Sequence, residues 1–591
     1  MFARGSKRYL IFSSIGWLAL LSSLMSGAAL AQDCVPDETR QTVRLPGKQQ
    51  NMSAMSECDE SRLAPPPLFQ DQPLEVVPDR WRIVDSLPGY EQNLLNPYQR
   101  NVLKGDKPIH DEDWFLSLSA ISDSVIELRQ IPTPVGPQST GGAGDIDIFG
   151  SGEQVTYSQS FIFEAAYLKG DTIFRPPDYE FRFIPVVNVN RTEVDEIRAL
   201  HIDPRDGDTR NDAHLGIQGA FFDYHIRNVS DRYDFDSIRI GIQPFNADFR
   251  GFLFQDSQFG IRLFGTRDNN IFQYNLAWFR RLEKDTNSGL NDVTEKLRDD
   301  DVFVANLYWQ DSPKLGFVTQ GTVLYNRNRE DEFFFDDNGF IARPASLGFE
   351  RPRDYDVVYA GLNGDGHFGR FNLTLSGYLA FGEADPGVFS TEKTDINAGF
   401  FAAEAGFDMD WIRWRVTGVY ASGDEDPYDN TENGFDAVFE NPIIAGADTS
   451  FWIRQGLPLI GGGGVTLSTR NGLLPNLRSS KEHGQSNFTN PGLQLLGVGA
   501  DLDLTPSTRL SFNVNHLRFD NTAVLQAMRQ QADIDNEIGL DISAALIWRP
   551  LEIQNVVCRL SAARLLPGDG FDQLYAEESR YSVLANLILT Y

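Results

Sequence analysis

The sequence predicts an all-β protein: a transmembrane antiparallel β-barrel of about 18 strands with short periplasmic turns and long extracellular loops. Three observations predict it. Apolar and polar residues alternate with period two from residue 113 onward, as in strands with one lipid-facing and one water-facing side. The connections between these segments alternate between short and long. The last segment ends on an aromatic residue, Tyr591.

The composition excludes several other classes. A formal net charge of −31 argues against a protein that binds nucleic acid through a basic surface. The 42 Phe, 19 Tyr and 9 Trp are too many for a disordered chain, and three Cys are too few for a disulfide scaffold. A mean hydropathy of −0.32 leaves no room for several helical spans, but it fits a barrel, whose lumen side is polar.

Residues 1–31 are predicted to be a cleaved signal peptide. Arg4, Lys7 and Arg8 precede an apolar run, and Ala29-Leu30-Ala31 is a small-x-small cleavage signal. The alternative is an uncleaved membrane anchor, which the Ser and Gly inside the run disfavour. Export and a barrel together predict the outer membrane of a Gram-negative cell envelope, with outer-membrane lipid around the wall.

Residues 32–112 are predicted to be an irregular periplasmic or lumenal segment. They are rich in Pro, Gln and Asp and show no sustained period. The segment would be either a linker or a plug of the lumen. Cys34 and Cys58 are close enough in sequence to form a disulfide in an oxidising compartment, and two free thiols are the alternative.

The barrel is predicted to span residues 113–591. Phe371, Leu379 and Phe381 illustrate one face of a strand, and Asn372 and Ser376 the other. The eighteen predicted strands begin near residues 114, 155, 178, 213, 235, 259, 270, 302, 316, 355, 371, 400, 413, 491, 508, 538, 554 and 581.

The lengths of the connections distinguish a barrel from the alternative, a secreted all-β protein of two or three domains. Short turns are predicted at 266–269, 311–314, 364–367 and 505–507. Long loops are predicted at 191–212, 283–300, 328–354, 383–399, 424–489 and 520–537. Such loops gather at one end of an outer-membrane barrel, whereas a sandwich has no reason to gather them. The last strand, Tyr581 to Tyr591, resembles the one that such barrels present to the barrel assembly machinery.

Charged residues on the polar faces are the candidate selectivity residues of the lumen. They are Arg182, Arg239, Arg262, Arg413, Arg415, Arg549, Arg559, Glu404, Asp408, Asp410 and Asp541. Rings of opposite charge would create a selectivity zone, and arginines would guide a carboxylate or phosphate by bidentate contacts. The alternative, of equal weight, is that these charges pair across neighbouring strands and hold the wall rigid.

Carboxylates are dense in the longest predicted loop, with Asp424, Asp426, Asp429, Glu432 and Asp436 close together. Hard oxygen ligands at that density could hold Ca²⁺, although the spacing differs from an EF-hand, and a solvated acidic loop is the alternative. The sequence lacks CxxCH, HExxH, GxSxG and Walker motifs, so neither an enzyme nor a resident cofactor is predicted.

The chain resembles the alginate-export-like eighteen-stranded family in its strand count. It also resembles that family's closing hairpins in two segments, Glu537-Ile538-Gly539-Leu540-Asp541 and Leu565 to Phe571. The resemblance implies an arginine-lined channel for an anionic polymer.

Three functions are predicted as alternatives. The first is a porin-like channel for passive or solute-selective passage of small solutes through a charged lumen. The second is a barrel sheath for a periplasmic partner, for example a multihaem cytochrome. The third is a surface receptor or adhesin that works through the loop 424–489.

Overall fold

The computed structural model of the protein describes residues 94, 96–98, 101–111, 113–133, 151–170, 176–232, 234–344, 351–459, 465, 470–475, 477–478, 480–575 and 580–591. All of them belong to one compact unit, Pro88–Tyr591. The expected signal peptide 1–31, Cys34, Cys58 and most of the segment 32–112 lie outside the described residues.

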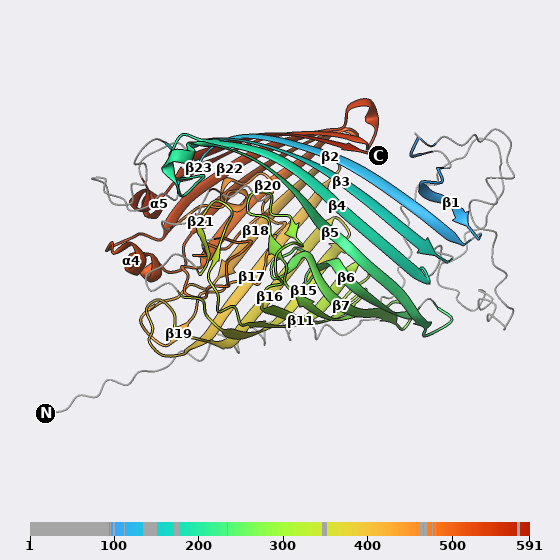
Figure 1. Cartoon of the computed structure of the whole chain (residues 1–591), viewed down its shortest axis with the longest axis horizontal. Helices are drawn as coiled ribbons and strands as arrows, with labels where there is room; N and C mark the ends of the chain where they lie inside the picture. Colours follow the sequence, from blue (N-terminus) through green and yellow to red (C-terminus); the bar gives the residue numbers. More distant parts are fainter. Residues whose placement is uncertain are drawn as a thin grey trace, which may run out of the picture. The chain divides into compact units, whose positions relative to one another are not determined.

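The wall is a closed antiparallel barrel (Figure 1). Within the described residues it has eighteen strands, and each predicted strand start lies within six residues of an observed one. The strands are β2 (Trp114–Gln130), β3 (Glu153–Lys169), β4 (Tyr179–Val194), β5 (Thr209–Asn228), β6 (Phe235–Asn246), β7 (Gln255–Arg267), β8 (Phe272–Arg280), β11 (Asp300–Trp309), β12 (Phe317–Asn328), β15 (Tyr355–Phe368), β16 (Phe371–Ala384), β17 (Thr394–Met409), β18 (Ile412–Ala421), β20 (Leu493–Thr505), β21 (Thr508–Arg518), β22 (Glu537–Trp548), β23 (Val556–Pro567) and β24 (Arg580–Thr590).

The barrel closes where the last strand meets the first. β24 pairs with β2 from Ile121↔Thr590 to Gln130↔Tyr581. A short strand, β1 (Lys104–His110), pairs with the remaining end of β2, from Lys104↔Ser117 to His110↔Trp114. Because β1 and β24 occupy successive parts of the same edge, that edge offers few unpaired backbone groups. β1 is a regular element within the segment that was expected to be irregular.

Connections of the two kinds lie at opposite ends of the barrel. Two-residue turns at 369–370, 410–411 and 506–507 are at one end. The connections 281–299, 329–354 and 422–492 are at the other, where α4 (Ala523–Arg529), α5 (Asp569–Leu574) and β19 (Thr431–Glu432) also lie (Figure 1). The predicted gathering of the long loops at one end is therefore confirmed.

The two faces of each strand differ as the alternation predicts. On β16, Leu379 and Phe381 point outward and are 43% and 46% exposed, whereas Tyr378 points into the lumen and is 2% exposed. Large apolar side chains cover the outside of the wall in the same way on the other strands, as a lipid-facing surface requires. No helix among the described residues is long and apolar enough to cross a membrane.

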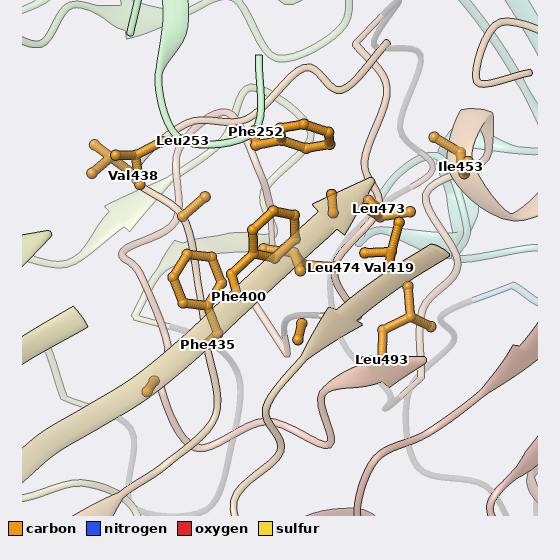
Figure 2. Close-up of a cluster of buried hydrophobic side chains, with 14 of the residues drawn as sticks. Phe252, Leu253, Phe400, Val419, Phe435, Val438, Ile453, Leu473, Leu474 and Leu493 are labelled. Atoms are coloured by element: carbon orange, nitrogen blue, oxygen red, sulfur yellow. The ribbon is translucent and has the colours of Figure 1, made fainter. Parts of the chain in front are cut away.

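Part of the lumen is apolar and filled, which the sequence did not predict. Figure 2 shows Phe252 and Leu253 from the connection 247–254 packed near Phe435 and Val438 from the connection 422–492. The lumen side of the wall is apolar there too, with Phe400 of β17 in the same cluster. Two long connections fold inward and bury their apolar side chains against the wall, because folding inward removes them from water.

Candidate functional site: the constricted lumen

The first inward connection, residues 247–254, is organised around one carboxylate. Asp248 is 3% exposed and accepts hydrogen bonds from the backbone N–H groups of Arg250 (2.9 Å), Gly251 (2.6 Å), Phe252 (3.1 Å) and Leu253 (3.1 Å). The Tyr378 hydroxyl on the wall donates a fifth, at 3.0 Å. A carboxylate that satisfies several backbone donors at once fixes a tight loop conformation.

This connection crosses the lumen and is fastened to the wall on the way. The carbonyl of Ala247 accepts from the side chains of Asn306 (3.2 Å) and Gln320 (2.8 Å), on β11 and β12. Farther along, the guanidinium of Arg250 donates to Thr374 on β16, at 2.7 Å. The loop therefore lies across the bore at the depth of these side chains.

The second inward connection, residues 422–492, pairs with the first through its backbone. Phe439 donates to the carbonyl of Leu253 (3.1 Å), Asn441 to that of Gly251 (2.8 Å) and Ile443 to that of Arg250 (2.9 Å). The two loops thus form one backbone-bonded unit inside the barrel.

The far side of that loop is held by wall carboxylates. Glu404 on β17 accepts from the N–H of Ala445 at 3.2 Å. Asp541 on β22 is fully buried and accepts from Ser450 (2.5 Å) and from the N–H of Trp452 (3.0 Å), at the start of the short helix α3 (Phe451–Arg454). Glu404 and Asp541, two of the predicted lumen acids, face inward and position the loop.

The predicted arginines of one wall form a row with unequal partners. Arg182 on β4 pairs with Glu164 and Glu180, both at 2.6 Å. Arg239 on β6 pairs with Asp223 at 2.8 Å. These contacts match the alternative in which the charges neutralise one another across strands.

Arg262 on β7 is the exception in this row. It donates to the amide oxygen of Asn275 at 2.7 Å and lies over the rings of Phe264 (4.7 Å) and Phe245 (5.4 Å). No carboxylate of the described chain lies within ion-pair distance of it. The charge of Arg262 is therefore not paired with a carboxylate of the described chain.

The other predicted residues lie apart from this row. Arg415 pairs with Asp501 at 3.0 Å and with Glu404 at 3.7 Å, and Arg559 pairs with the loop residue Asp448 at 3.1 Å. Arg413 and Asp408 pair with each other at 2.5 Å beside the turn 410–411, and Asp410 belongs to that turn. Arg549 follows the end of β22 in another short connection. The short-turn end, and not the constriction, therefore contains Arg413, Asp408, Asp410 and Arg549.

A cavity of about 570 Å³ lies beside Arg262, between the wall and the inward loops. Its lining includes Asp256, Tyr308 and Arg470, which the sequence analysis did not single out. Arg470 reaches Asp256 at 3.0 Å from the long connection, 214 residues away in the sequence. Only the folded loop brings them together, so no local pattern could have indicated the pair.

The long connections are further joined by buried ion pairs. Arg298 pairs with Glu330 (2.8 Å), and Arg343 pairs with Glu283 (2.5 Å). Burial alone would raise the pKa of Glu283, but hydrogen bonds from His483 and Arg343 and the charge of Arg298 bring it well below its usual value. These pairs hold the loops in one arrangement, since removing one partner would leave a buried charge unpaired.

The predicted calcium ligands do not gather. Glu432 pairs with Arg353, and Asp436 pairs with Arg478 at 2.6 Å. Asp426 and Asp429 accept backbone N–H bonds within their own turns. No group of three or more His, Cys, Asp or Glu residues in the described ranges is placed to hold a metal ion.

Asp424 stands out among these acids, because it is 1% exposed and forms no ion pair with a cation of the described residues. Burial, together with the charges of Glu432 and Asp429, raises the pKa of Asp424 to about 7. A carboxyl group whose pKa is raised by folding stabilises the folded state most at pH values below the usual carboxyl pKa near 4. This stabilisation is lost as the pH rises through about 7.

We expect Asp424→Asn to be nearly neutral for stability at about pH 4 and to stabilise the protein at about pH 8.5. The gain is on the order of 1–3 kcal/mol, since each pKa unit corresponds to about 1.4 kcal/mol. Thermal unfolding of both proteins at the two pH values measures it, with the exposed Asp426→Asn as control. A stabilisation that is equal at both pH values would contradict the raised pKa of Asp424.

Comparison with known proteins finds relatives by structure only. No protein-family model matches the chain, and no curated protein sequence matches it. Among solved structures, Pseudomonas aeruginosa OccK9 (OpdG) is similar at 12% identity and TM-score 0.44, over 80% of this chain and 97% of that one. OccK7 (OpdD) of the same organism gives 10% and 0.42, over 80% and 98%. P. aeruginosa OpdK, solved with vanillate, gives 11% and 0.41, over 80% and 98%. At this identity the likeness concerns the fold alone.

Proposed function

We propose that the protein is a solute-selective channel of the outer membrane of a Gram-negative cell, exported by a cleaved signal peptide. The observation that carries the proposal is the combination of a closed barrel, two loops that narrow its bore, and Arg262 beside the remaining cavity. Such an arrangement admits small solutes and discriminates among them by charge at the narrow point.

The favoured solute is a small anion. Arg182 and Arg239 are neutralised by neighbouring carboxylates, whereas Arg262 is not. Asn275 and Tyr308 line the same cavity and supply hydrogen-bonding groups around the charge. A carboxylate or phosphate would satisfy the guanidinium donors of Arg262 that the wall leaves open.

The inward loops weigh against the sheath alternative. They occupy the lumen that a multihaem or other periplasmic partner would have to enter, and they are bonded to the wall on several sides. The receptor alternative has no comparable observation in its favour, because much of the connection 422–492 is folded inward and buried.

Charge selectivity in planar bilayers tests the proposal. We expect a preference for anions under a salt gradient, and we expect Arg262→Gln to reduce the anion-to-cation permeability ratio several-fold. Arg549→Gln is the matched control, since that arginine also lacks an ion pair in the described chain but lies in a short turn. Unchanged reversal potentials in Arg262→Gln would refute the role of Arg262, and a protein that never opens a pore would refute the channel.

A further inference from the structure

The lipid-facing side of β2 to β6 carries residues in three successive rows, which the strand register aligns. Nearest the short-turn end, Trp114, Lys169, Tyr179 and Tyr224 are opposite one another on neighbouring strands. The next row inward contains Tyr167, Phe181, Phe222 and Ile240. The third contains Ala165, Phe183 and Ala220.

The third row makes the surface hollow. Ala165 and Ala220 flank the large ring of Phe183, so the wall is recessed on both sides of that ring. A groove of about 530 Å³ lies there, and its lining includes both alanines together with Tyr167, Phe181 and Ile240.

The first row supplies a single cation among aromatic rings. The Lys169 ammonium lies 5.5 Å from the ring centre of Trp114 and 6.0 Å from that of Tyr179. Trp114 stacks on Tyr167 at 4.5 Å, and Tyr179 stacks on Tyr224 at 5.4 Å. Lys169 has no ion pair in the described part of the chain. Tryptophan and tyrosine in this arrangement mark the level of the lipid head groups.

The spacing of the rows matches the dimensions of a lipid. Ala165 and Lys169 are four residues apart on β3, which is about 13 Å along a strand at about 3.3 Å per residue. The ammonium is therefore at head-group level while the hollow lies in the hydrocarbon region. A phosphate at Lys169 would place an acyl chain in the groove.

We propose that this outer surface binds one diacyl glycerophospholipid of the periplasmic leaflet. Lys169 contacts its phosphate, and one acyl chain lies in the groove over Ala165 and Ala220. The charge complementarity between the unpaired ammonium and a phosphate selects this occupant over a second copy of the chain related by a twofold axis through this surface, because that copy would place another Lys169 against the first. The inference is independent of which solute the lumen passes.

Native mass spectrometry of the purified full chain with added phosphatidylglycerol tests the proposal. The wild-type protein is expected to retain one phospholipid at activation energies that strip the others. Lys169→Gln is expected to weaken retention about tenfold, as for loss of one charge-assisted hydrogen bond. Ala165→Trp together with Ala220→Trp fills the groove and is expected to abolish the retained molecule.

Ala403→Trp, on the lipid-facing side of β17, is the control, and folding of every variant is verified by its heat-modifiable gel migration. Equal retention by the wild type and the groove-filling variant overturns the proposal. So does preferential retention of lipid A, or a dimer that the same substitutions dissociate, because each identifies a different occupant.

Discussion

Replacing residues 436–486 by a short Gly–Ser linker is expected to raise single-channel conductance roughly two- to fivefold, since the segment occupies the bore and current follows the open cross-section. The design is feasible because the two ends of the segment meet. The N–H of Gly434 donates to the carbonyl of Phe488 at 2.8 Å, so the linker has almost no gap to span. The eighteen wall strands are left intact.

A shorter deletion in the same connection controls for this result. Within residues 426–429, Asp426, Tyr428 and Asp429 are exposed and Pro427 is buried. Their removal is expected to leave conductance within about 20% of the wild-type value, because they do not narrow the bore. If the large deletion conducts no better than this control, the loop is not the constriction.

The second large effect is expected at Asp248. Asp248→Ala removes the acceptor of four backbone N–H groups and of the Tyr378 hydroxyl. Each buried donor left unsatisfied costs about 1–3 kcal/mol, so the connection 247–254 is expected to lose its single conformation. Hydrogen exchange at residues 250–253 is then expected to accelerate at least about a hundredfold, as a local loss of roughly 3 kcal/mol implies. Open-channel current is expected to become noisy.

Two further variants test whether the charge of Asp248 and its position in the loop are needed. Asp248→Asn keeps one acceptor oxygen and is expected to give an intermediate exchange rate. Asp365→Asn alters another lumen carboxylate, which accepts from side chains only, at Thr374 (2.6 Å) and Arg250 (3.4 Å), and it is expected to leave the loop ordered. Normal protection of residues 250–253 in Asp248→Ala would disprove the organising role.

The wall could be predicted from the sequence because its determinants are local. Leu379 and Phe381 meet lipid while Tyr378 meets the lumen, and this alternation follows directly from the period of a strand. The contacts of the inward loops could not be predicted in this way. Asp541 reads as a lumen charge in the strand pattern, but it is the anchor of α3, whose residues come about ninety positions earlier. Arg470 and Asp256 likewise meet only after the long connection has folded.

The sequence also could not decide whether the lumen arginines act as selectivity residues or pair with neighbouring carboxylates. Arg182, Arg239 and Arg262 occupy equivalent positions in their strands, and the pattern treats them alike. Their difference arises from their neighbours: Asp223 faces Arg239 across the β5–β6 pair, whereas Asn275 receives the bond from Arg262. The register between strands decides which partner each arginine meets, and register is a property of the assembled sheet.

The two inward loops are joined to each other by main-chain hydrogen bonds at Phe439, Asn441 and Ile443. The calibre of the bore therefore depends on the main chain of the two loops and on the carboxylate of Asp248 that organises it. The chemistry at the bore, by contrast, depends on individual wall side chains such as Arg262. Under the proposed function, width and preference can thus change independently during evolution: a single substitution on β7 would alter the preferred solute, while the size limit would be inherited unchanged.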